Sequence, residues 1–314
     1  MKRKTEVSEL IFKVIAYLFL IVFSLMCLYP LIYALSSAVS TSKAIDTGKV
    51  VLWPVGFQGK AFLYVLTSNN FWVGYSNTLF ITFFGTIWSL GYSILGAYAL
   101  SKKRLLARHG FNFFLVVTMW FSAGIVPQYL NYLSTSKIFG AIGITDLKWT
   151  VVLAMGMNAT NIILLRNSFE GVPSEIEEAA RIDGATELQI LTKVYIPMSK
   201  ATIATVALFF GISRWNGYFW ANKIVYEEGQ QWSVPVQVYI RNFLGQYTTI
   251  AGSGEGSSTG LDMATAWYNN PAHTYSATSV LYAMVVCAVI PILAIYPFIQ
   301  KYFAKGVNMG GVKE

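Results

Sequence analysis

Long apolar runs alternate with shorter polar intervals along most of the chain. Several of the runs reach the roughly 20 residues that an α-helix needs to cross about 30 Å of hydrocarbon. The pattern predicts six membrane-spanning helices, at about residues 11–35, 75–100, 111–130, 149–169, 196–222 and 277–300. We therefore expect an all-α integral membrane protein in which residues 1–314 form a single membrane domain.

Two of the apolar runs carry helix-breaking residues. Pro30 lies late in the first run and is expected to kink it. In the third run, residues 121–127 read FSAGIVP, and small residues with a proline at membrane depth predict a broken helix. Residues 38–40 (AVS) resemble a signal-peptide cleavage site, but the first run is longer than a signal h-region, so we favour a retained membrane anchor.

Composition and charge support this membrane assignment. The chain is 55% hydrophobic and only 12% charged, which is too apolar for a soluble globular protein. Basic residues flank the apolar runs at 102–108 and after residue 300, as topology signals do, and no nucleic-acid partner is indicated. These basic residues predict that both termini and the interval 173–197 are cytoplasmic. Residues 223–276, with a Gly/Ser-rich tract at 252–258, then form a long external loop.

The polar interval 173–197 carries two capping boxes. Ser174 with Glu177, and Thr186 with Gln189, each place a hydroxyl three residues before a side chain that reaches back to the helix start. The interval is therefore predicted to form two short helices.

Asp183 and Gly184 separate the two predicted helices. Gly184 is expected to end the first helix with a positive φ. Ile176, Ala179 and Ala180 share one face of that helix, which is apolar but nearly flat and allows another surface to come close. Taken alone, this face fits packing on the chain itself as well as docking of a partner.

The sequence lacks the chemistry of an enzyme or an ion-coupled carrier. It contains no G-x-x-x-x-G-K-[ST] phosphate loop, so ATP hydrolysis requires a separate protein. His109 and His273 fall on opposite sides of the predicted membrane, so no metal site is expected. We find no catalytic residues, and acidic residues are scarce within the apolar runs.

Amide and aromatic side chains within the runs suit a neutral, hydroxyl-rich solute, because amides hydrogen-bond hydroxyls and rings stack on sugar C–H faces. The same residues also fit a role in helix packing or at the membrane interface. Candidate substrate-pathway residues are Asn77, Asn158, Asn161, Arg214, Trp215, Asn216 and Tyr218. Arg214 lies about 25 Å along a helix beyond Pro197, where it either snorkels to the external interface or faces a water-filled cavity or a partner subunit.

The motif within 173–197 is Glu178-Ala179-Ala180, three residues, Gly184, nine residues, and then VYIP at 194–197. It resembles the EAA loop of binding-protein-dependent ABC importers, in which this loop forms a coupling helix seated in a cleft of the ATPase subunit. Val194 and Ile196 depart mildly from the isoleucine and leucine that are usual there.

The resemblance extends to other segments. Residues 96–101 (GAYALS), 121–127 and 215–216 (WN) look like the carbohydrate-uptake, maltose-type permeases. Residues 218–221 (YFWA) and 234–241 (VPVQVYIR) look more like the polysaccharide and complex-oligosaccharide branch. The tail 305–313, with Gly310, Gly311 and Lys313, is similar to that of the second permease of each pair, which reaches toward the ATPase. The Gly/Ser-rich tract near residue 254 departs from the pattern.

The resemblance implies a type I ABC importer permease fold in the cytoplasmic membrane. Its implied partners are a homologous second permease, two ATPase subunits that bind ATP and Mg, an extracytoplasmic solute-binding protein, the sugar substrate and membrane lipid. Glu178 would contact a basic residue of the ATPase cleft, Ala179 and Ala180 would allow close approach, and Asp183 and Gly184 would set the turn. The alternatives are an ABC permease for a non-sugar solute, such as a peptide or amino acid, or an ion-coupled secondary carrier.

Overall fold

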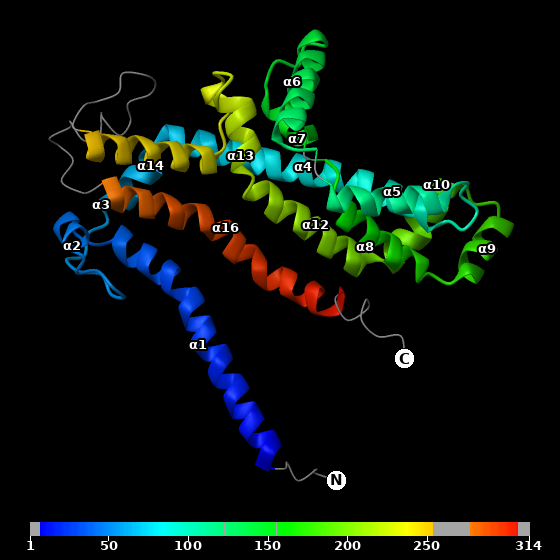
Figure 1. The fold of residues 1–314 in the computed structure, drawn as a ribbon, viewed down its shortest axis with the longest axis horizontal. Coiled ribbons are helices and arrows are strands. Elements are labelled where there is room, and N and C mark those ends of the chain that lie inside the picture. Colours follow the sequence, from blue (N-terminus) through cyan, green and yellow to red (C-terminus); the bar gives the residue numbers. More distant parts are fainter. Residues whose placement is uncertain (1–6, 122, 155, 254–276, 307–314) are drawn as a thin grey trace. The chain divides into compact units, whose positions relative to one another are not determined.

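The computed structural model describes residues 7–121, 123–154, 156–253 and 277–306 of the chain. All regular structure within these ranges is helical, which confirms the all-α prediction (Figure 1). The α-helices are α1 (Val7–Ala38), α2 (Ser42–Asp46), α3 (Lys60–Thr67), α4 (Asn69–Ser101), α5 (Arg108–Trp120), α6 (Ile125–Ala141), α7 (Lys148–Ala154), α8 (Ala159–Glu170), α9 (Ser174–Ile182), α10 (Glu187–Ile190), α11 (Ile196–Met198), α12 (Lys200–Trp215), α13 (Tyr218–Ala221), α14 (Val236–Ser253) and α16 (Ala277–Gly306). The π-helical turns η1 (Leu191–Tyr195) and η2 (Asn222–Tyr226) and the 3₁₀ turn η3 (Gln231–Ser233) lie between them.

Three helices are individually long and apolar enough to cross a membrane: α1, α4 and α16. Three further candidates are pairs of shorter helices bent at a break: α5 with α6 at 113°, α7 with α8 at 52°, and the segment Glu187–Met198 with α12 at 87°. Up to six spans result if each bent pair counts as one. The break between α5 and α6 falls within residues 121–127, where the sequence predicts it.

Several helix bounds differ from the sequence prediction. α4 begins at Asn69 rather than near residue 75, and α1 extends from Val7 to Ala38 rather than from about 11 to 35. The fourth and fifth predicted spans are each broken, and α12 ends at Trp215 instead of near residue 222. The predicted external loop contains the helix α14. Its Gly/Ser-rich tract lies largely outside the described residues.

The chain divides into two compact units, Met1–Phe71 with Ile240–Ile290 and Trp72–Tyr239 with Pro291–Glu314. In the first unit, the C-terminal part of α1 packs on α16, where the rings of Tyr33 and Tyr282 meet edge to face at 5.6 Å. The rest of α1 is exposed, in keeping with a helix that faces lipid.

One apolar cluster of the second unit positions the polar interval 173–197. It joins the C-terminal part of α4, α8, η1 and α12 through buried side chains that include Leu165, Phe169, Tyr195 and Phe210. Leu165 and Phe169 are four residues apart and therefore lie on one face of α8. The end of α4 and the start of the fifth candidate span are thus packed on a common core.

Arg214 lies buried inside the second unit, so the prediction that it snorkels to the external interface is wrong. The residue is only 4% exposed, and its guanidinium donates to the carbonyl oxygen of Val151 at 2.7 Å and to the hydroxyl of Ser89 at 2.9 Å. Val151 belongs to the last turn of α7, whose carbonyls lack a partner within the helix. Gly85 leaves the space for the guanidinium, because a Cβ there would lie 3.0 Å from the Arg214 Nε. Arg214 therefore caps α7 at the break in the fourth candidate span.

Candidate functional site

The polar interval folds as two short helices, α9 and α10, joined by a tight turn. Gly184 has a φ of +80°, as the sequence predicts. Its N–H donates to the carbonyl of Arg181 at 3.0 Å, and the N–H of Ala185 donates to that of Ala180 at 3.0 Å. These two bonds form a Schellman motif, in which a residue without a Cβ takes the left-handed conformation that ends the helix. Gly184 thus fixes the angle between α9 and α10.

The second capping box is confirmed and the first is wrong. The Thr186 hydroxyl accepts from the Gln189 N–H at 3.4 Å, and the Gln189 side chain accepts from the Thr186 N–H at 2.8 Å. At the start of α9, Pro173 holds the cap position, Ser174 is already the first helical residue, and no side chain caps the helix. The Glu177 carboxylate pairs instead with Lys102 and Arg181.

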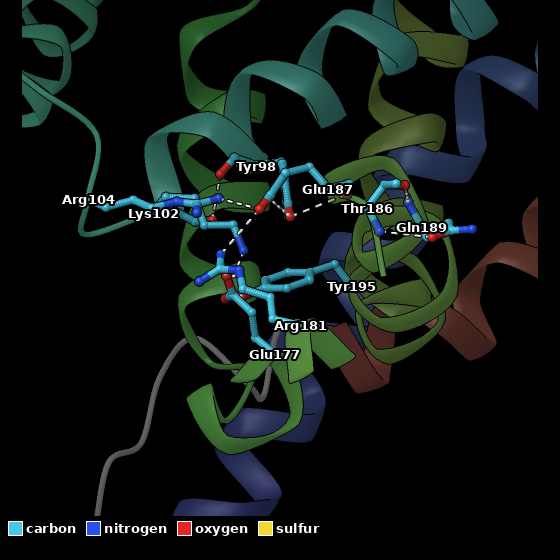
Figure 2. Close-up of polar contacts among 10 residues, drawn as sticks. Tyr98, Lys102, Arg104, Glu177, Arg181, Thr186, Glu187, Gln189 and Tyr195 are labelled. Atoms are coloured by element: carbon cyan, nitrogen blue, oxygen red, sulfur yellow. Dashed lines mark hydrogen bonds and ion pairs between the residues drawn. The ribbon is translucent and has the colours of Figure 1, made fainter. Parts of the chain in front are cut away.

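Lys102, just beyond the C-terminal end of α4, is buried against α9 (Figure 2). Its ammonium nitrogen lies 2.8 Å from Oε2 of Glu177. It also lies 4.1 Å from the ring centroid of Tyr98 and 4.0 Å from that of Tyr195, and these two rings are close to perpendicular. A single cation therefore joins α4, α9 and η1 by one ion pair and two cation–π contacts.

Two carboxylates extend this contact into a network. Glu177 also accepts from the Tyr195 hydroxyl and from Arg181. Glu187, on α10, accepts from the Tyr98 hydroxyl at 2.8 Å and pairs with Arg104 and, at 3.3 Å, with Arg181. We call the seven residues the Lys102 cluster: Tyr98, Lys102, Arg104, Glu177, Arg181, Glu187 and Tyr195 (Figure 2).

Burial and neighbouring charges have opposite effects on the pKa of each member of the central pair. Burial alone would raise the pKa of Glu177, but the ion pair with Lys102 and the hydrogen bond from Tyr195, with the charge of Arg181, outweigh it and hold the pKa below its usual value. Burial lowers the pKa of Lys102, and the adjacent Glu177 opposes that effect. The Glu177 carboxylate is therefore ionised at neutral pH and remains a counter-charge for Lys102.

The outer face of α9 is exposed. Glu178 and Ala179 lie on it, Ile176 is 41% exposed and Ile182 is 86% exposed. Ala180, which the sequence places on the same face as Ile176, packs instead on the core cluster of the second unit. The helix therefore uses one side to hold the chain together and presents carboxylates and apolar side chains on the other.

A groove of about 670 Å³ runs beside this helix. Its walls come from the segment after α4, the end of α8 and α9 itself; they are residues 101–104, 108, 169–175, 177, 178, 181 and 195. Five basic and four acidic side chains line it, so the groove suits a partner surface that carries both signs of charge.

The candidate substrate-pathway residues serve different local purposes. Asn77 is buried and donates to the carbonyls of Trp232 at 2.8 Å and Val234 at 3.3 Å. Asn158 caps α8, because its side chain accepts from the N–H of the buried Asn161 at 3.1 Å. The side chains of Asn77 and Asn158 thus support the fold, as the helix-packing alternative expects, whereas Asn161 contributes its backbone N–H.

The other pathway candidates lie at the end of α12. Trp215 is buried, with its ring edge-on to that of Tyr75 at 5.9 Å. Asn216 and Tyr218 are exposed just beyond it. Substrate contact by any of these residues stays a prediction. Gly310, Gly311 and Lys313 of the predicted ATPase-facing tail lie outside the described residues.

Comparison with known proteins places the chain in a family. Residues 3–309 match the family described as the binding-protein-dependent transport system inner membrane component. The chain belongs to this family. It is thus an inner membrane, multi-pass permease and part of a binding-protein-dependent ABC transporter complex, which confirms the recognition made from the EAA-like motif.

Individual relatives resemble the chain over nearly its whole length. A polygalacturonan/rhamnogalacturonan transport system permease protein of Bacillus subtilis is 34% identical, with 96% of this chain and 98% of that protein covered. A maltodextrin transport system permease protein of the same organism is 27% identical over 98% of both chains. The crystal structure of a bacterial ABC transporter involved in the import of the acidic polysaccharide alginate contains a chain that is 39% identical, with a TM-score of 0.80 and coverage of 96% of this chain and 100% of that one.

Proposed function

We propose that this permease serves an ATP-driven importer that moves an oligosaccharide released from a polysaccharide. The observation that carries the proposal is the full-length similarity to permeases named for polygalacturonan/rhamnogalacturonan transport and for alginate import. Both of those polymers carry carboxylates, so a uronic-acid oligosaccharide is the first solute to test. A neutral malto-oligosaccharide is the natural comparison, because the maltodextrin permease is a more distant relative.

The complex that we propose contains this chain, a homologous second permease, two ATPase subunits and an extracytoplasmic solute-binding protein. The ATPase contact is the exposed face of α9, with Glu178 and Ala179 on it. Basic residues at 102–108 support a cytoplasmic position for this end of the second unit and, with the basic residues after 300, for both termini.

The geometry of α9 supports a mechanical role. Closure of the ATPase dimer on ATP would draw the two coupling helices toward each other, and hydrolysis would release them. Because α9 is held to its own chain on one side and free on the other, such a displacement would move the attached spans as rigid bodies. The solute cavity would then open alternately to the two sides of the membrane.

ATP-driven uptake into proteoliposomes tests the proposal. The complete transporter is reconstituted with its binding protein, ATP is enclosed, and ion gradients are collapsed with ionophores. We expect labelled galacturonate oligosaccharides to accumulate, and malto-oligosaccharides to accumulate less. Uptake that requires an ion gradient and does not depend on ATP would indicate a secondary carrier. Accumulation of peptides or amino acids in place of sugars would contradict the substrate class.

A further inference from the structure

The end of α4 and the helix α9 are far apart in the sequence yet joined directly in space. Along the chain, α9 continues from α8 and leads through the Gly184 turn into α10. Its displacement therefore reaches α8 and α10 through covalent connections. The 33-residue helix α4 has no such connection, and the Lys102–Glu177 pair links its end to α9 by non-covalent contact.

That contact is a built site rather than a surface ion pair. Lys102 is 8% exposed, and its ammonium nitrogen lies between two tyrosine rings with a carboxylate at 2.8 Å. Cation–π attraction is stronger when water is excluded, and a well-placed counter-charge offsets the cost of burying a cation. The pair therefore holds one arrangement, and its two ends move together for as long as it stays formed.

The surroundings of the pair reach further elements. The Tyr195 ring that covers Lys102 also meets the ring of Phe169, on α8, edge to face at 5.6 Å. The Tyr98 ring on the other side belongs to α4 itself, and the Tyr98 hydroxyl donates to the Glu187 carboxylate of α10. The contacts around Lys102 therefore connect α9 to α4, to α8 and to the start of the fifth candidate span.

We propose that Lys102 is a positioning residue that makes α4 follow α9, so that the Lys102–Glu177 pair sets how much solute is transported for each ATP hydrolysed. This inference rests on the proposed function of α9 as the ATPase contact. Loss of the pair would leave the ATPase contact intact while α4 lags behind the coupling helix.

The test uses the complete reconstituted transporter with Lys102→Met, Glu177→Gln and the double variant. Methionine keeps the length of the lysine stem, and glutamine keeps the shape of the carboxylate. We expect ATPase activity to stay within about twofold, while solute transported per ATP falls roughly fivefold or more, the lower end of typical coupling between two sites. Lys102→Arg, which keeps the charge and stacks on aromatic rings, should recover most of the loss.

Lys193→Met is the matched control. Lys193 lies on η1, is exposed, and belongs neither to the Lys102 cluster nor to the walls of the groove, so this variant loses the same charge without opening the cluster and should transport normally. The double variant separates transmission from folding, because it leaves no uncompensated buried charge. We expect it to assemble with the ATPase and still to transport little solute per ATP.

Two outcomes would overturn the inference. One is a double variant that assembles and transports the normal amount of solute per ATP. The other is loss of the ATPase from both the single and the double variants, which would make the pair a requirement for assembly. If Glu178→Lys and Gly184→Pro also transport normally, the proposed ATPase contact of α9 fails as well. If those two lose uptake while the Lys102 variants do not, only this inference fails.

Discussion

Replacing Gly184 with proline is expected to lower ATP-driven uptake by about tenfold or more while the transporter still assembles and inserts. Gly184 has a φ of +80°, whereas proline is fixed near −65° and has no N–H for the carbonyl of Arg181. The Schellman turn is then lost, and α9 no longer keeps its angle to α10. Uptake and ATPase activity of the purified, reconstituted variant measure the effect.

Gly143→Pro is a matched control for this variant. Gly143 follows α6 with a φ of +85°, its N–H donates to Gly140 at 3.1 Å, and Ile144 donates to Phe139 at 2.9 Å. The same substitution thus destroys the same kind of helix end away from α9. If Gly143→Pro reduces uptake as much as Gly184→Pro does, the effect is general damage, and the turn after α9 has no special part in transport.

Reversing the charge of Glu178 is expected to lower uptake roughly tenfold, because like charges placed opposite each other in an interface cost several kcal/mol. Glu178 is exposed on α9, where it is proposed to meet a basic residue of the ATPase cleft. Glu178→Lys should insert normally but retain less ATPase on purification and lose solute-stimulated hydrolysis. Glu178→Gln, which removes the charge without reversing it, should show an intermediate loss.

Glu175→Lys controls for charge reversal on the same helix. Glu175 is also exposed and lies in the first turn of α9, where a carboxylate favours the helix. An equal loss in both variants would point to the helix, or to the groove that both carboxylates line, rather than to a specific contact at Glu178. Normal uptake and normal stimulated ATPase activity in Glu178→Lys would contradict the assigned contact.

Features of the fold that depend on local chemistry are predictable from the sequence. The turn at Gly184 follows from the need for a positive φ, and the box at Thr186 follows from a hydroxyl three residues before a glutamine. The box expected at Ser174 fails because Glu177 has charged and phenolic partners that come from elsewhere in the chain. Local spacing carries no information about such partners.

The breaks in the fourth and fifth spans are not predictable from the sequence either, because they too depend on partners from distant parts of the chain. Apolar runs show where a helix crosses the membrane but not where its axis bends. The end of α7 is stabilised by Arg214, which lies 63 residues further along the chain. A basic residue at membrane depth does signal a special environment, but its partners, a backbone carbonyl and Ser89, appear only in the folded chain.

The Lys102 cluster is the feature of the candidate site that the sequence interpretation misses. The basic residues after α4 fit the positive-inside rule so well that no further role is needed for them. Tyr98 and Lys102 are four residues apart, a spacing that brings two side chains together on a helix, but Lys102 lies just beyond the end of α4. What the spacing leaves out is Tyr195, which supplies the second ring from far along the chain.

The most direct test of the central claim is a site-specific cross-link from the exposed face of α9 in the complete transporter. Ile182, 86% exposed, is replaced by a photoreactive amino acid, with the 66% exposed Ile142 beyond α6 as the control position. We predict a covalent product between position 182 and the ATPase subunit, and none from position 142. Cross-links from position 182 that reach only lipid or this chain itself would contradict the claim that α9 couples this permease to a separate ATPase.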